Sequence, residues 1–305
     1  MTAAMTTGGA PADDNPYHSL TQETDPDPRW AFGTGFSDPL AGVTGAVPDG
    51  VAGEDLAAYC LMLGDDALVF SHRLQEWMTR APELEEEAAL ANVALDLLGQ
   101  ARLLLQRAGR ADGSDRSEDD YAFDRREHEF RQVRLVEGAD PDFGALVLRL
   151  LIFSTFRLAV LDRLRGSHDP VLSAIAGKAV PELTYHRDYA AAWVIRLGDG
   201  TPLSHRRMTE ALATICPLVL QLFTAHPVET RLAAAGVAVD PAEVRAEVDS
   251  VLRTVFEAAT LSAPVCQPLP GVVCRVGRSG VHTEAFGHLL AELQSVARAY
   301  PGATW

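Results

Sequence analysis

Apolar residues recur at helical spacing along most of the chain from about residue 54 onward. When each stretch is projected at about 100° per residue, its leucine, valine and alanine positions gather on one face. No stretch shows the strict apolar–polar alternation that is typical of a β-strand. The pattern predicts helices at about 54–79, 82–108, 117–133, 141–165, 170–198, 202–224, 241–261 and 281–299.

Proline and acidic residues indicate where several of these helices begin. Pro82 is followed by glutamates, which are favourable near the positive N-terminal end of a helix. Asp169 is a suitable N-cap for a helix whose first residue is Pro170. Pro181 lies inside that helix and predicts a kink. The four long helices in the first two-thirds of the chain predict an all-α fold, a four-helix bundle with additional C-terminal helices.

The first 50 or so residues differ in composition from the rest of the chain. They are rich in Gly, Pro, Asp, Thr and Ala, which predicts a mostly disordered N-terminal extension over residues 1–50. Its aromatic residues Trp30, Phe32 and Phe36 are candidates for docking on the body of the protein or on a partner. The helical domain is expected to span residues 51–305.

Polar residues interrupt the apolar faces of three predicted helices at comparable depth. Gln100 falls inside the apolar face of the second helix, and Asp96 lies on its flank. Ser154 lies near the middle of the apolar face of the predicted helix 141–165. Glu182 and His186 lie one turn apart on the apolar face of the predicted helix 170–198. Burying such groups unpaired would cost roughly several kcal/mol each. We therefore expect them to form a buried hydrogen-bond network.

A metal centre is the alternative use of such positions. A di-iron bundle needs a Glu from each of two helices and a Glu-x-x-His from each of the other two, because residues three apart share a helix face. The predicted helix 82–108 offers Leu97 and Gln100 at that spacing, and the predicted helix 141–165 offers Ser154. These residues cannot complete the set, so the sequence predicts no di-iron centre. A single adventitious metal at Glu182 and His186 stays open.

Composition excludes several other classes of function. The net charge of −16 disfavours nucleic acid, whose phosphates would be repelled. No uninterrupted apolar run reaches the roughly 18 residues of a membrane span, and the first residues lack the pattern of a secretory signal. The cysteines form no close pair, so they are expected to be reduced and the protein to be cytoplasmic. They are Cys60, Cys216, Cys266 and Cys274.

Four long segments, in this order, closely resemble the PaaC branch of the PaaA/PaaC ferritin-like family, subunits of bacterial phenylacetyl-CoA epoxidase. The segments are "LGDDALVFSHRLQEW", "APELEEEAALANVALDLLGQARLLL", "SHDPVLSAIAGKAVPELTYHRDYAAAWVIRLGDG" and "GVHTEAFGHLLAELQSVARAYPGATW". The resemblance covers residues 57–305 and leaves the N-terminal extension outside. It implies a ferritin-like helical fold.

The resemblance also implies a division of labour in a monooxygenase complex of aerobic phenylacetate catabolism. The PaaA subunit holds the di-iron site and the CoA ester, and PaaC pairs with it as a non-catalytic structural subunit. PaaB bridges such pairs, and the PaaE reductase supplies electrons from NADPH through FAD and an iron–sulfur cluster. Catalytic relatives carry a Glu-Ala-Gly-His type run where this chain has Leu-Leu-Gly-Gln at 97–100. No catalytic residue or cofactor is therefore expected in this chain.

The first predicted helix is apolar on nearly every side, which is typical of a helix that is covered by its own bundle on one side and by a partner on the other. The first two helices, over about residues 57–107, are therefore predicted to supply much of the contact with PaaA, and Phe70 and Trp77 are predicted to face that partner. Two other functions stay open. One is an autonomous ferritin-like oxidase with an atypical metal site, and the other is a helical module that binds an acyl-CoA without chemistry.

Overall fold

The computed structural model describes residues 40, 42–263, 265–267, 277–301 and 303. The chain divides into two units at Asp38 and Pro39, and every described residue lies in the second. Most of the predicted N-terminal extension, with its three aromatic candidates, therefore lies outside the described residues.

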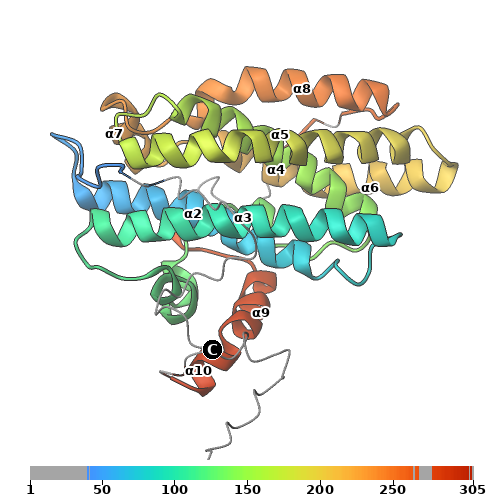
Figure 1. Cartoon of the computed structure of the whole chain (residues 1–305). Helices are drawn as coiled ribbons and strands as arrows, with labels where there is room; N and C mark the ends of the chain where they lie inside the picture. The colour runs from blue at the N-terminus through green and yellow to red at the C-terminus, as the bar shows by residue number, and fades with distance from the viewer. Residues whose placement is uncertain (1–39, 41, 264, 268–276, 302, 304–305) are drawn as a thin grey trace, which may run out of the picture. The chain divides into compact units, whose positions relative to one another are not determined.

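Four long helices form the bundle. They are α2 (Gly53–Gln75), α3 (Leu84–Ala111), α4 (Phe143–Leu164) and α5 (Pro170–Gly198). α2 packs along α3 and α4 packs along α5, and α3 lies beside α5 (Figure 1). No strand occurs in the described part of the chain, and the predicted all-α fold is confirmed.

Shorter helices follow, and two of them, α6 and α8, pack against α4 and α5, whereas α7 packs against α2. The α-helices are α6 (Pro202–Val219), α7 (Pro227–Ala234), α8 (Arg245–Ala258), α9 (Glu284–Leu293) and α10 (Ser295–Ala299). Single turns of 3-10 or π-helix are η1 (Asp120–Asp124), η2 (Glu127–Glu129), η3 (Arg134–Val136), η4 (Leu220–Phe223), η5 (Pro241–Val244) and η6 (Gly277–Ser279).

Two predicted features of the helix α5, its N-cap and its internal proline, can be compared directly with the structure. The Asp169 carboxylate accepts the Leu172 N–H at 2.8 Å, so Asp169 is the N-cap of α5 as predicted. α5 continues through Pro181, which is exposed to solvent.

The predicted helix 117–133 is wrong, because this segment forms only the short turns η1 and η2. Buried Arg125 bonds the Asp65 carboxylate on α2, and this contact holds the segment against the bundle.

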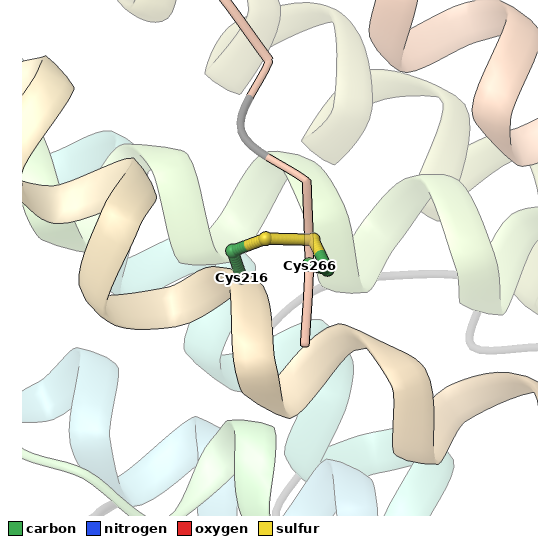
Figure 2. The surroundings of a disulfide bond; sticks show 2 residues. All are labelled: Cys216 and Cys266. Carbon is green, nitrogen blue, oxygen red and sulfur yellow. A yellow bond between two sulfur atoms is a disulfide. The ribbon is translucent and has the colours of Figure 1, made fainter. Parts of the chain in front are cut away.

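The expectation that all cysteines are reduced is wrong for two of them. Cys216 on α6 forms a disulfide with Cys266, which follows α8 (Figure 2). The partners are 50 residues apart, so no short spacing motif in the sequence could reveal the pair. Cys60 is a buried thiol whose pKa is raised by burial. Cys274 lies outside the described residues.

Two helices are long and apolar enough to cross a membrane by length and composition alone, namely α3 and α4. This corrects the expectation that no segment is apolar enough, because a few polar residues interrupt the runs without making the helices hydrophilic. The two helices differ in burial. In the most apolar 18-residue stretch of α4, 94% of the residues are buried inside the protein, whereas the share in the corresponding stretch of α3 is only 44%. The apolar surface of α4 is thus used by the core, and much of that of α3 is not.

Candidate functional site

The Arg157 guanidinium lies at the centre of the polar residues inside the bundle. Arg157 is buried on α4, and its Nε–H donates to the side-chain oxygen of Gln100 on α3 at 2.9 Å. Its Nη1–H donates to the Leu63 carbonyl on α2 at 3.0 Å. Gln100 donates in turn from Nε2 to Glu182 on α5 at 2.9 Å. One cation therefore connects all four helices of the bundle.

The Glu182 carboxylate is held between two donors. Besides the Gln100 amide, it accepts a hydrogen bond from Lys178 Nζ, one turn earlier on α5, at 2.5 Å. Burial lowers the pKa of Arg157 to about 10, and the nearby carboxylates of Asp66 and Glu182 act in the opposite direction. Arg157 therefore stays a cation at neutral pH, and the negative charge of Glu182 is balanced by this chain's own residues.

Asp96 and His186 form a separate pair between α3 and α5. His186 Nε2 lies 2.9 Å from Asp96 Oδ2. The His186 side chain has no exposed surface, whereas 36% of the Asp96 side chain is exposed. His186 Nδ1 and Arg157 Nη2 are buried and have no hydrogen-bond partner among the described residues. Buried polar atoms of this kind are usually satisfied by ordered water.

The five residues predicted to form one network thus fall into two bonded pairs and a separate hydroxyl. Ser154 donates to the Leu150 carbonyl of its own helix at 2.6 Å. The prediction also omits Arg157, the residue that organises the site. A signal was present in the sequence, because Arg157 lies three residues after Ser154 on a mostly apolar helix, and a buried charge needs partners.

The chemistry of these donors does not fit a di-iron centre. A guanidinium only donates hydrogen bonds, so Arg157 cannot ligate a metal ion. Gln100 turns its oxygen toward Arg157, and Glu182 is bonded by Lys178 and Gln100. Glu182 and His186 bond different partners, although they were considered together as a single-metal site. Over the described ranges, no three His, Cys, Asp or Glu side chains are grouped as metal ligands.

Phe70 and Trp77 do not face a partner, so their predicted role at an interface is wrong. Phe70 has no exposed surface and packs edge-on against Phe153 of α4, with ring centroids 4.9 Å apart. Trp77 is 5% exposed and packs near Phe143. The helix α2 is apolar on nearly every side because this chain itself surrounds it, through α3, α7 and η3.

Exposed apolar side chains lie on α3 and α5, which run across the front of the bundle in Figure 1, among exposed polar residues such as Asn92 and Arg102. Among the described elements, α3 packs substantially only against α2 and α5. Leu95 of α3 is 63% exposed, and Tyr185 of α5 is 51% exposed. We call this surface the α3–α5 face and define it by Ala88, Asn92, Leu95, Gly99, Tyr185 and Ala192.

The two helices of this face are firmly joined along their length. Glu86 near the start of α3 accepts hydrogen bonds from Tyr189 and Trp193 of α5, at 2.5 and 2.8 Å. The Asp96–His186 and Gln100–Glu182 contacts follow along the same seam. The face is therefore a fixed surface rather than two independent helices.

Comparison with known proteins identifies the family. The family model described as phenylacetic acid catabolic protein, PaaA_PaaC, matches residues 47–305. The chain belongs to this family. The C subunit of 1,2-phenylacetyl-CoA epoxidase from Escherichia coli (strain K12) is 40% identical over 250 residues, which is 82% of this chain and 99% of that protein. The resemblance stated from the sequence segments is confirmed, together with the ferritin-like helical fold.

Proposed function

We propose that this chain is a non-catalytic structural subunit of a multicomponent phenylacetyl-CoA epoxidase in aerobic phenylacetate catabolism. In this proposal it pairs with the di-iron catalytic subunit, of the PaaA type, and stabilises it. The identity to the C subunit of the Escherichia coli epoxidase supports membership of such a complex. The interior of the bundle supports the non-catalytic role.

The observation that carries the proposal is the position of Arg157. A di-iron bundle ties its four helices together through carboxylates and imidazoles that share two metal ions. Here the guanidinium of Arg157 ties the same four helices through Leu63, Gln100 and, by way of Gln100, Glu182. The positive charge that the carboxylate needs comes from Arg157 and Lys178. In this proposal the side chains inside the bundle do the structural work of a metal centre, and the residues that the structure describes contain no group of three metal-ligating side chains.

The remaining components of the proposed complex lie on other chains. The di-iron site and the acyl-CoA belong to the PaaA subunit, and PaaB bridges the pairs. FAD, the iron–sulfur cluster and NADPH belong to the PaaE reductase. Neither nucleic acid nor a membrane is a proposed partner, and the net charge of −16 supports the first of these.

A cytoplasmic location is part of the proposal, because CoA esters are intracellular metabolites. The disulfide between Cys216 and Cys266 weighs against a strongly reducing compartment, since disulfides are rare in the cytosol. Trapping thiols during cell lysis, followed by peptide mapping, shows directly whether this bond exists in cells.

Reconstitution tests the proposed function. The catalytic subunit is assayed for NADPH- and dioxygen-dependent turnover of phenylacetyl-CoA with the bridging subunit and the reductase, with and without this chain. We expect turnover only when both bundle subunits are present, and no turnover when this chain replaces the catalytic one. Calorimetry with phenylacetyl-CoA and this chain alone should show no binding. Turnover by this chain without its partner would favour the autonomous oxidase, and tight binding would favour the acyl-CoA module.

A further inference from the structure

The middle of α3 contains a glycine that the chain's own packing does not explain. A Cβ added at Gly99 would meet nothing within 4 Å. Glycine inside a helix costs about 1 kcal/mol relative to alanine, so an unoccupied helical glycine needs another reason. By contrast, a Cβ at Gly64 on α2 would lie 3.0 Å from Leu105. Gly99 therefore leaves room on the surface for something outside the described chain.

Gly99 lies on the α3–α5 face, together with large apolar side chains that have no cover. Leu95 and Tyr185 are more than half exposed, and the exposed small residues Ala88 and Ala192 lie about two turns away from them on the same helices. Large side chains next to small gaps form the ridges and grooves by which helices pack against helices. The pattern on this face is thus suited to another helical surface.

We propose that the α3–α5 face is the docking surface for the catalytic, PaaA-type subunit. The inference rests on the proposed function and names the surface by which the two subunits pair. The family model covers both kinds of subunit, so the partner is itself a bundle with long helices to present. Hydrogen bonds of Glu86, Asp96 and Gln100 to α5 fix the face in advance, which lowers the entropic cost of binding.

The length of α3 and α5 suits an interface with another helical bundle, and the α3–α5 face is the central part of that length. A 28-residue helix such as α3 is about 42 Å long, and neighbouring helices lie about 10 Å apart. The residues that define the face cover only positions 88–99 of α3, about 17 Å of that length, so they form the centre of an interface to which each partner typically contributes about 800 Å². Asp96 adds a polar element, because its carboxylate is 36% exposed while buried His186 holds it from below. The partner surface should therefore be apolar, with a hydrogen-bond donor opposite Asp96.

Two variants of the full chain test this surface against the PaaA-type subunit by co-purification and by titration. Leu95→Arg places a charge in the apolar centre and should weaken pairing by roughly 100-fold, as hot-spot residues do. Gly99→Leu fills the gap, so it should weaken pairing by a similar factor while the chain alone melts at the same or a higher temperature, since leucine favours the helix. Val296→Arg, at a 51% exposed residue of α10, is the matched control and should pair normally.

The outcomes separate the surface from the proposed function. If the wild-type chain does not bind the PaaA-type subunit, the proposed function fails and the surface with it. If the wild-type chain binds and both variants bind equally well, only the surface is wrong. Gel filtration of the chain alone and sedimentation with phosphatidylcholine vesicles complete the test. Self-association or vesicle binding that Leu95→Arg abolishes would assign the face to a second copy or to lipid, and would overturn the proposed partner.

Discussion

Arg157 donates its Nε–H to the side-chain oxygen of Gln100 across the centre of the bundle, at 2.9 Å. The contact fixes the orientation of the amide, which must then turn its nitrogen toward Glu182. The Glu182 carboxylate is thereby bonded by an amide on one side and by Lys178 on the other. Because protein groups balance this carboxylate, the bundle is suited to a structural role.

Replacing Arg157 tests its structural role. Arg157→Met keeps much of the side-chain volume but leaves the Gln100 oxygen without this donor, and the Leu63 carbonyl keeps only its helical hydrogen bond. A buried acceptor left unsatisfied costs about 1–3 kcal/mol, so the free energy of unfolding should fall by about 1–3 kcal/mol. Urea unfolding followed by circular dichroism measures it.

Arg163→Met on the same helix is the matched control. Arg163 pairs with Glu247 at the surface, where its side chain is 37% exposed, and such pairs contribute little. Its loss should cost less than about 1 kcal/mol. Equal stabilities for the wild type and Arg157→Met would show that the bundle does not depend on this cation.

The disulfide should contribute measurably to stability. It closes a loop over a sequence separation of 50 residues and joins α6 to the segment after α8. Cross-links of this kind typically stabilise by about 2–4 kcal/mol. Adding dithiothreitol should therefore lower the melting temperature of the wild type, and the double variant Cys216→Ser, Cys266→Ser should show the lower value with or without reductant. A wild type that melts identically in both conditions would argue that the bond is absent in solution.

His72 on α2 should make stability depend on pH in a predictable direction. Burial lowers the pKa of His72 below its usual value of about 6.5. The folded state therefore favours the neutral imidazole. Its contribution is fully present above about pH 6.5 and is lost as the pH falls toward the lower pKa of the folded state. His72→Gln removes this contribution.

Melting temperatures measured between pH 7.5 and 5 provide the comparison. Both proteins should lose stability on acidification, because many carboxylates also titrate, but the wild type should lose more than His72→Gln below pH 6.5. Parallel curves for the two proteins over this range would mean that His72 is not the group responsible.

The helices could be predicted from the sequence because their apolar periodicity is long and regular. α2 to α5 each extend over several turns, so the period is clear even where polar residues interrupt it. The segment 117–133 could not be predicted in this way. Its helical propensity is overridden by the buried contact between Arg125 and Asp65, which are 60 residues apart in the sequence.

The site was predicted only in part, for a similar reason. The helical projection places Asp96, Gln100 and His186 correctly near the interior, but it cannot show with which side chains they form hydrogen bonds. Arg157 was not predicted, because a guanidinium is not a metal ligand and so belongs to no ligand motif. Phe70 was assigned to an interface because a helix surrounded by its own chain and a helix shared with a partner have the same apolar pattern.

Iron content is the most direct test of the central claim, that this bundle is completed by Arg157 instead of by metal. The chain is purified alone from iron-replete cells, and its iron is measured beside that of the PaaA-type subunit prepared in the same way. We expect almost no iron in this chain and about two atoms in the catalytic one. About two irons per chain here, retained after gel filtration, would contradict this claim and make this chain a candidate oxygenase.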